Sequence, residues 1–411
     1  MRYVTAGESH GKALIALLEG VPAGVKVSTR IIREELAKRR GGIGRGARQK
    51  FEEDSVTILS GVLQGKTIGS PIAIMIENTE WPKWEQIMSP DGVSETRESG
   101  ANLLGEVSPS LLSQSDSSAT PSPGGTPQTP APNVPDGEEF DRLQRPRPGH
   151  ADLEGVRKYG FDSARPVLER ASARETAARV AASVVASALL DQAFGVEISA
   201  SVVQFGSVKR EKGEGDLEFD ARAEQHAKDA AGAGDTIGGV VEVIAKNVPP
   251  GLGSYVSADT RLDAKLAGAL MSIQAVKGVE VGVGFRFADL PGSKAHDAIT
   301  HLGSSGYARE TNHAGGIEGG ISNGEDIILR IAIKPIPSVP GGLKTVNMQT
   351  LEESRGHSQR SDLSAVYPAR LVAKAMVALT LADAATKRFG EDSLAMMKSA
   401  YQHSTFDRSE S

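Results

Sequence analysis

The sequence predicts an α/β protein, and three of its features support that fold class. Short stretches rich in Val and Ile alternate with longer helix-like stretches along the chain. Glycines flank most of the strand-like stretches, as expected where a chain turns at the end of a strand. A faint internal repeat aligns residues 7–24 with residues 234–251 without gaps. Structural duplication explains such a match, although chance is an alternative in a glycine-rich chain.

The repeat predicts a glycine turn, a strand and an exit loop that the fold uses more than once. Gly7 aligns with Gly234, and Gly24 aligns with Gly251. Residues 65–78 resemble the second copy as well. The histidine of the first copy, at position 10, aligns with an isoleucine, so only one copy would carry chemistry.

The predicted strands are rich in Val and Ile, which favour the extended conformation. They are Ser55–Val62, Pro71–Ile76, Glu197–Val203, Gly239–Ala245, Val279–Phe285 and Ile327–Ile333.

Helices are predicted from capping residues and apolar spacing. Ser28 or Thr29 caps the first, which ends at Arg40 before two glycines. Ser172–Glu175 fits a capping box ahead of an alanine-rich helix that ends near Gly195. Two further helices run from Asp259 to about Lys277 and from Pro368 to Phe389.

Composition excludes several classes of protein. The 411 residues include no cysteine, which excludes disulfides, thiolate metal sites and a cysteine nucleophile. A net charge of -6 argues against general binding to nucleic acid. The longest small-apolar run, Val180–Leu190, is too short to span a bilayer, and the N-terminus does not resemble a secretory signal. We therefore expect a cytoplasmic protein that binds neither nucleic acid nor membrane.

Two segments differ in composition from the rest. Residues 107–137 are rich in Ser, Pro, Thr and Gly and contain too few apolar side chains to offset the entropy of ordering. They are predicted to form a flexible insertion. Residues 404–411 are predicted to be a polar tail, and residues 1–403 a single domain that carries the insertion.

The segment Gly7–Gly11 reads Gly-Glu-Ser-His-Gly and fits the nucleophile elbow of serine hydrolases. Only six residues precede it, too few to build the sheet from which that elbow projects. What remains is Ser9 and a proton-exchanging His10 in a glycine-framed turn. A plain turn with a solvated histidine is the alternative.

The segment from Arg39 to Arg48 offers several arginines among flexible glycines. Gly42–Ala47 fits a dinucleotide-binding pattern, but it follows a helix rather than a strand, so that function is excluded. Arginine forks suit phosphate and carboxylate groups, which favours an anion clamp at Arg39, Arg45 and Arg48. A solvated basic face is the alternative.

Three further loops complete a candidate acid–base site. His150 follows a proline–glycine corner, and Asp362 closes an Arg-Ser-Asp triplet. Arg170 precedes the start of a predicted helix, where an anion can bind, although simple capping by Ser172 explains it equally well. The chain lacks the His-Glu-x-x-His spacing of a zinc site, and no metal is expected.

Taken together, these segments resemble chorismate synthase. The resemblance extends in order over most of the chain and is more specific than any single motif. It rests on Gly7–Gly11, Arg39–Arg48, Arg147–Asp152, Ala171–Thr176, Gln274–Glu280, Asn312–Gly320, Lys334–Ser338 and Arg360–Asp362.

The resemblance implies a lyase of the shikimate pathway of aromatic amino-acid biosynthesis. The family converts 5-enolpyruvylshikimate 3-phosphate to chorismate and phosphate by a 1,4-anti elimination, and it needs reduced FMN without net redox change. Its fold is an α/β sandwich of antiparallel sheets with helices packed between them, assembled as a homotetramer. NADPH and an external flavin reductase are implied as sources of reduced flavin.

By resemblance, His10 with Ser9 would assist the leaving phosphate, His150 would protonate the reduced flavin, and Asp362 would help flavin N5 accept the ring proton. Arg39, Arg45 and Arg48 would bind substrate anions, and the first two also match NADPH contacts. Flavin contacts carry over to Arg170, Ala171, Ser172, Gln274, Ala275, Gly319, Lys334, Pro335, Ile336, Pro337, Ser338 and Arg360.

The chain departs from the family's pattern in three places. The insertion at 107–137 is longer than expected, Tyr367 interrupts an Ala-Val-Pro-Ala sequence, and Ala171 replaces a frequent serine, so only its backbone is expected to contact the cofactor. Two other functions are less consistent with the sequence. A serine hydrolase using Ser9 lacks the upstream strands, and an anion-binding scaffold leaves the acid–base loops without a purpose.

Overall fold

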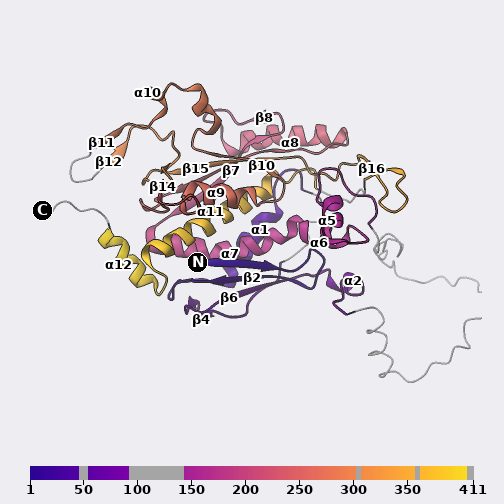
Figure 1. The fold of residues 1–411 in the computed structure, drawn as a ribbon, viewed down its shortest axis with the longest axis horizontal. Helices are drawn as coiled ribbons and strands as arrows, with labels where there is room; N and C mark the ends of the chain where they lie inside the picture. Colours follow the sequence, from indigo (N-terminus) through magenta and orange to yellow (C-terminus); the bar gives the residue numbers. More distant parts are fainter. Residues whose placement is uncertain (46–53, 92–142, 302–306, 357–361, 405–411) are drawn as a thin grey trace, which may run out of the picture.

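The chain forms a sandwich of two antiparallel sheets with helices between them (Figure 1). The computed structural model describes residues 1–45, 54–91, 143–301, 307–356 and 362–404. The predicted insertion at 107–137, Arg48 and Arg360 lie outside these residues. The sandwich architecture implied by the resemblance is confirmed.

The first sheet has the strand order β1-β2-β6-β3, and the second has the order β10-β15-β9-β7-β8. The strands of the first are β1 Arg2–Ala6, β2 Ala13–Glu19, β3 Val56–Ile58 and β6 Ile72–Glu77. Those of the second are β7 Glu197–Phe205, β8 Val208–Lys209, β9 Gly239–Lys246, β10 Val276–Val281 and β15 Ile327–Ile333.

The remaining strands form small hairpins, and the helices lie between the two sheets or around them. The hairpin strands are β4 Val62–Leu63, β5 Lys66–Thr67, β11 Ile299–His301, β12 Tyr307–Arg309, β13 Ile317–Glu318, β14 Ile321–Ser322, β16 Lys344–Val346 and β17 Glu353–Arg355. The α-helices are α1 Thr29–Arg40, α2 Trp81–Trp84, α5 Asp152–Tyr159, α6 Arg165–Ala171, α7 Thr176–Phe194, α8 Asp216–Gly232, α9 Leu262–Met271, α10 Gly292–Ala295, α11 Val366–Phe389 and α12 Leu394–Ser404. The 3-10 helices are η2 Ala173–Glu175, η3 Ala258–Thr260 and η4 Gly284–Asp289.

The two halves of the chain repeat one topology. Strands β1, β2, β6 and β3 of the first sheet correspond in order to β7, β9, β15 and β10 of the second. One hydrogen bond recurs in both halves: Thr67 Oγ1 donates to the Pro22 carbonyl at 2.6 Å, and Ser322 Oγ donates to the Pro249 carbonyl at 2.6 Å. The predicted duplication at 7–24 and 234–251 therefore corresponds to β2 and β9.

Residues 65–78 resemble the second copy in sequence, but the structure gives them a different counterpart. They contain β5 and β6, whose counterparts in the second half are β14 and β15 at residues 320–333. Both segments carry glycines with positive φ, at Gly65 and Gly320, where each hairpin turns. Similar glycine spacing in three places hid the correct pairing.

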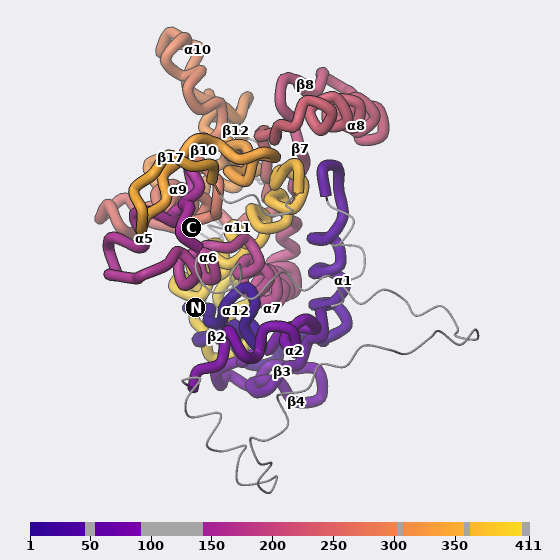
Figure 2. Tube along the Cα trace, turned by 90° about the vertical axis from the view of Figure 1, so that its right-hand side faces the viewer, coloured from indigo at the N-terminus to yellow at the C-terminus, as the bar shows by residue number. Residues whose placement is uncertain are grey.

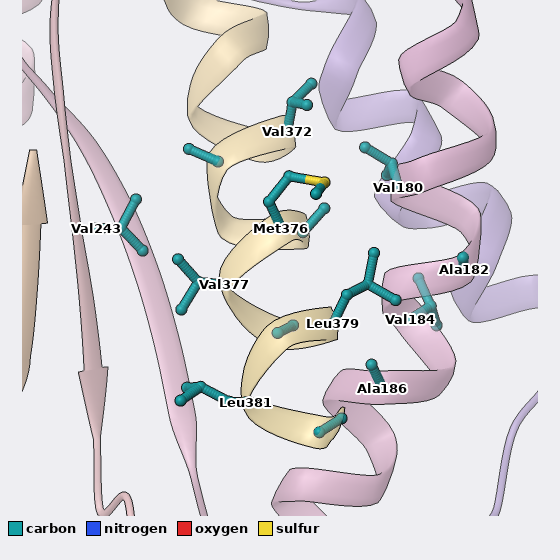
Figure 3. Packing of buried hydrophobic residues seen from close by; sticks show 14 of the residues in the cluster. Val180, Ala182, Val184, Ala186, Val243, Val372, Met376, Val377, Leu379 and Leu381 are labelled. Carbon is teal, nitrogen blue, oxygen red and sulfur yellow. The ribbon is translucent and has the colours of Figure 1, made fainter. Parts of the chain in front are cut away.

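Helices α7 and α11 form the centre of the layer between the sheets (Figures 1 and 2). They run in the same direction, and Leu379 of α11 points towards α7 while Val377 points towards Val243 of β9 (Figure 3). Helix α7 is rich in alanine, which lets the neighbouring helices approach closely. Both helices are buried almost all round, as expected for helices that contact both sheets.

This close packing predicts that a larger side chain in α7 destabilises the fold. Ala186 is fully buried, so Ala186→Leu should lower the free energy of unfolding by about 1–3 kcal/mol through overpacking. Ala221→Leu on the exposed face of α8 is the matched control and should change it by less than about 0.5 kcal/mol. Denaturant unfolding of both variants measures the difference, and equal values would contradict the packing argument.

Stretch 165–194, which includes α6 and α7, is long and apolar enough to cross a membrane by length and composition. Its apolar window is 67% buried within the fold, as expected for the core helix of a sandwich.

Several element boundaries differ from the prediction. Strand β1 was not predicted, β2 is the strand that the repeat predicts within 7–24, and the strand expected at 55–62 splits into β3 and β4. The third helix ends at Met271, because residues 276–281 extend as β10, and the strand expected to reach Phe285 gives way to η4. Ser404, assigned to the tail, is the last residue of α12.

Candidate active site

The candidate site lies at the end of the sandwich where both central helices begin (Figures 1 and 2). The turn that carries His10 connects β1 to β2, and it contacts the segment 169–175 just before α7. Gly7 has a φ of +102°, and a Cβ there would lie 2.3 Å from the Ala13 carbonyl oxygen. Glycine is therefore required for the turn to fold back against β2.

Glu169 holds the His10 turn through both its backbone and its side chain. Its carbonyl oxygen accepts the Ser9 amide at 3.0 Å, and Oε2 accepts the His10 amide at 2.8 Å. The two carboxylate oxygens lie 2.9 and 3.1 Å from Nδ1 of His10. Because Nδ1 is engaged, Nε2 is the ring nitrogen left for proton exchange.

Two aromatic and cationic side chains complete the surroundings of His10. The Trp84 ring lies 3.9 Å from the His10 ring between centroids, at an interplanar angle of 31°. Arg165 contacts Glu169 with Nη1 at 3.2 Å and lies 5.4 Å above the Trp84 ring. Burial raises the pKa of Glu169, but the hydrogen bonds from His10 and the charge of Arg165 outweigh it, so the pKa lies below its usual value.

Ser9 contacts Ser172 rather than a histidine, with the two Oγ atoms 3.0 Å apart. Ser172 caps η2 by accepting the Arg174 amide at 3.3 Å. The predicted capping box is wrong in one respect. The Glu175 carboxylate accepts hydrogen bonds from other residues and not from the Ser172 amide. The contact also disfavours a hydrolase, in which a histidine base would have to activate Ser9.

Glu175 connects the His10 turn to the loop after α9. Its carboxylate accepts hydrogen bonds from Thr5 Oγ1 at 2.6 Å, from Arg179 Nε at 3.0 Å and from Gln274 Nε2 at 3.3 Å. Arg170, predicted to contact flavin, donates to the carbonyl oxygens of Gly7 and Thr5 at 2.9 Å. In this structure Arg170 thus stabilises the turn that carries His10 by hydrogen bonding to its backbone.

A second histidine–carboxylate pair lies at the start of α5. Nδ1 of His150 is 2.6 Å from Oδ1 of Asp152. Arg147 donates to Asp152 from its backbone amide at 3.0 Å, from Nε at 2.8 Å and from Nη2 at 3.0 Å. Burial raises the pKa of Asp152, but hydrogen bonds from His150 and Arg147 hold it far below its usual value.

The loop 334–338 lies against this second pair. Lys334 Nζ donates to the Gly149 carbonyl, and Arg147 Nη1 lies 3.4 Å from Ser338 Oγ. The Lys334 amide donates to the Ala275 carbonyl at 2.9 Å, which brings the loop beside the end of α9. Burial and the charge of Lys277 lower the pKa of Lys334. Pro335 and Pro337 stiffen the segment, and the carbonyl of the intervening residue accepts a hydrogen bond from Thr236.

The arginine segment meets the start of α11. Arg45 and Asp362 form an ion pair, and the Leu363 amide donates to the Gly44 carbonyl at 2.8 Å. Arg39 is buried in the last turn of α1. A shallow cavity of about 310 Å³ adjoins Arg45, Leu363 and α8.

The contacts therefore gather most of the predicted residues at one end of the molecule. The exception is Gly319, which lies in the β13–β14 hairpin beside the start of α9, whereas Gln274 follows the end of that helix. The ten residues of α9 span about 15 Å, so Gly319 lies away from the other residues within one chain. Among the described residues, no three His, Asp or Glu side chains converge as a metal site.

Sequence reasoning missed the carboxylates that hold both histidines. Asp152 ends the Arg147–Asp152 segment, and its position two residues after His150 is the signal in the sequence that points to it. Glu169 lies 159 residues from its partner His10, and nothing in the sequence pattern connects them.

Comparison with known proteins identifies the family. The sequence model of the chorismate synthase family matches residues 1–386. A chorismate synthase of Thermobifida fusca is 49% identical over 413 aligned residues, covering 96% of each chain. One from Mycolicibacterium vanbaalenii is 51% identical and covers 96% of this chain and 93% of its own. A crystal structure of a chorismate synthase matches with a TM-score of 0.69 at 33% identity, covering 98% of this chain and 96% of that one. The chain belongs to the chorismate synthase family.

Proposed function

We propose that the loops around His10 and His150 form the active site at which the chain carries out its family's reaction. That reaction eliminates phosphate from 5-enolpyruvylshikimate 3-phosphate to give chorismate, so the enzyme is a phosphate lyase of aromatic amino-acid biosynthesis. The observation that carries the assignment to these loops is the pair of histidines whose Nδ1 atoms each lie against a buried carboxylate. Such pairs fix the ring orientation. The pair at His10 leaves Nε2 for proton transfer, whereas Nε2 of His150 lies 3.4 Å from Arg147 Nη2.

The electrostatics of this end of the molecule suit a substrate with a phosphate and two carboxylates. The N-terminal ends of α7 and α11 lie here, and helix N-termini favour anions. Arg39 and Arg45 lie at the end of α1 beside the start of α11. We assign them to the substrate's anionic groups, or to NADPH, and we keep Arg48 in the same role as a prediction.

His10 supplies the proton to the leaving phosphate. The protonated ring donates from Nε2 to a phosphate oxygen as the carbon–oxygen bond breaks, while the proton on Nδ1 stays on the ring and remains hydrogen-bonded to Glu169. Ser9, beside His10, supplies a hydroxyl for a further hydrogen bond to the same group.

The loop after α9 and residues 334–338 fit a reduced FMN. Gln274 Oε1 is buried without a hydrogen-bond partner in the part of the chain that the structure describes, so it can accept a donor from a ring. Lys277 and Lys334 supply positive charge for an anionic group. Reduced FMN supplies an electron-rich ring that assists phosphate loss without net oxidation.

The remaining flavin assignments follow the family resemblance. The backbone of Ala171, Ser172 and the positive-φ Ala275 would line the ring together with residues 334–338, while Arg170, Gly319 and Arg360 are kept as predicted contacts. His150, held by Asp152, would stabilise the charge of the reduced ring. Arg45 would leave its ion pair with Asp362 to bind the substrate. Asp362 would then help flavin N5 accept the proton from the substrate ring.

An anaerobic assay tests the proposal. Purified protein with chemically reduced FMN and 5-enolpyruvylshikimate 3-phosphate should produce chorismate absorbance and free phosphate in equal amounts. A parallel assay with NADPH and oxidised FMN tests whether the chain reduces its own flavin or needs an external flavin reductase, which we expect. Absence of product in the first assay would contradict the proposed function.

The first sheet supports the proposed assembly as a homotetramer. Its inner face packs on the helix layer, while its outer face is also apolar and carries Val4, Ile15, Leu17, Ala73 and Met75 in adjacent register. The outer face of the second sheet instead carries a Glu242–Arg330 ion pair and serines of β7. A sheet that is apolar on both faces is covered on both, and a second copy of this face matches it in chemistry.

A charge on this face should weaken the assembly. Val4 is 43% exposed, so Val4→Lys should disturb folding little but desolvate a charge between copies. Light scattering should show a smaller mass than for the unchanged chain. Leu217→Lys on α8, where the side chain is 90% exposed, is the control and should keep the original mass. An unchanged mass for Val4→Lys would exclude this face as an interface.

The domain bounds, the insertion, the cellular location and the absence of macromolecular partners remain predictions. We propose a single domain over residues 1–403 with an insertion at 107–137, in a cytoplasmic enzyme without nucleic-acid or membrane partners.

A further inference from the structure

Glu169, near the end of α6, contacts the His10 turn through both its backbone and its carboxylate. Its carbonyl oxygen binds the amide of Ser9, and its carboxylate binds both the amide and the ring Nδ1 of His10. One residue thus binds the two consecutive backbone amides of Ser9 and His10 and the imidazole itself. The Glu169 side chain is 2% exposed, so these contacts are shielded from water.

The surroundings of Glu169 keep its carboxylate charged and in place. Arg165, one helical turn earlier in α6, pairs with the same oxygen that faces Nδ1. The Trp84 ring lies against the imidazole, and the Arg165 guanidinium lies 5.4 Å from the centroid of the Trp84 ring. The ring of His10 therefore has a carboxylate at Nδ1 and an aromatic face beside it, which restricts its rotation.

We propose that Glu169 is the positioning residue that orients His10 and stabilises its protonated form for transfer of a proton from Nε2 to the leaving phosphate. The inference rests on the proposed role of His10. In the step, the Nε2–H bond breaks as the phosphate oxygen–hydrogen bond forms, and the electron pair of the broken carbon–oxygen bond stays on phosphate. The electron pair of the broken ring C–H bond forms the new double bond as that proton leaves the ring. The Nδ1 proton remains between His10 and Glu169, whose negative charge offsets the imidazolium before transfer.

The test is the variant Glu169→Gln, which keeps the size and one acceptor but removes the charge. We expect kcat to fall about 10- to 100-fold, as for other residues that orient a functional histidine, with little change in KM. The alkaline limb of the kcat pH profile should move to lower pH, because a neutral amide no longer offsets the charge of the ring. Glu242→Gln removes another arginine-paired glutamate, on the second sheet, and should leave both unchanged.

A double-mutant cycle separates positioning from a general structural role. If Glu169 acts through His10, Glu169→Gln should have no further effect on kcat in a His10→Asn background. Additive losses would overturn the proposal, as would a wild-type rate and profile in Glu169→Gln alone.

A spectroscopic measurement keeps the proposal separate from the function on which it rests. The downfield proton resonance of His10 Nδ1–H, assigned by its absence in His10→Asn, should disappear or shift in Glu169→Gln but not in Glu242→Gln. If His10→Asn were fully active, the proposed role of His10 would fail, while this resonance would still report whether Glu169 holds the ring. An unchanged resonance in Glu169→Gln would overturn the positioning role.

Discussion

His10→Asn is expected to lower kcat by about 100- to 10,000-fold, the usual contribution of a general acid. The asparagine amide retains a polar group but has no proton to transfer to phosphate at neutral pH. Its smaller side chain also leaves Glu169 without its Nδ1 partner. The measurement is the anaerobic rate of chorismate formation with saturating reduced FMN.

The loss should occur without loss of the fold or of flavin binding. The His10 side chain is only 20% exposed but lies in a turn outside the hydrophobic core, so the unfolding midpoint should change little. His403→Asn on α12 is a control remote from the site and should keep full activity. A wild-type rate in His10→Asn would remove His10 from the mechanism, whereas an unfolded variant would show itself in the unfolding curve.

The parts of the fold that sequence predicted best are those determined locally. Helix α1 begins at Thr29 after the Ser28 cap and ends at Arg40, as predicted, because a capping side chain and two glycines mark its ends. Strand β15 at Ile327–Ile333 was also predicted at its observed bounds. Its alternation of buried and half-buried residues is imposed by the strand period alone.

Boundaries decided by tertiary contacts were predicted less well. The helix expected to reach Lys277 stops at Met271, because Val276 and the following residues pair with β15 as β10. No local signal ends α9 there. The residue with a positive φ in the turn after the helix is Ala275, where a glycine would have marked the turn in the sequence. Strand β2 was predicted only through the repeat, whose second copy contains the predicted strand Gly239–Ala245, and the repeat does not define its bounds.

The candidate site shows the same division. The motifs single out His10 and His150, whose catalytic roles remain predictions, and the contacts bring their loops to one end of the sandwich. The partners of those histidines depend on chain topology: His10 meets Glu169 only because the turn after β1 folds against the end of α6. Likewise, Arg45 and Asp362 form an ion pair although they lie 317 residues apart in the sequence, and no local pattern connects them.

Asp152→Ala is expected to have the second large effect, on both stability and turnover. The carboxylate accepts three hydrogen bonds from Arg147 and one contact from His150, and Arg147 is only 8% exposed. Removing it leaves a buried guanidinium without its counter-charge, which should lower the free energy of unfolding by about 3–5 kcal/mol. His150 would also lose the partner that orients it, so kcat should fall as well.

Glu154→Ala is the matched control, because Glu154 lies two residues later in α5 and forms only an exposed pair with Arg157. Its loss should cost no more than about 1 kcal/mol. Denaturant unfolding of both variants beside the unchanged chain measures the difference. Equal stabilities for the two variants would show that the Arg147–Asp152 pair contributes nothing beyond an exposed pair.

The pH dependence of this difference follows from the direction of the pKa shift. The pKa of Asp152 is lowered on folding, so the carboxylate contributes stability at pH values above its unfolded pKa of about 3.9. That contribution is lost as the pH falls below about 4 towards the folded pKa, because the folded state must then take up a proton it binds weakly. The stability gap between the unchanged chain and Asp152→Ala should therefore be constant from about pH 5 to pH 7 and narrow below pH 4. A gap that stays constant down to pH 2 would mean that the lost stability arises from packing of the side chain and not from its charge.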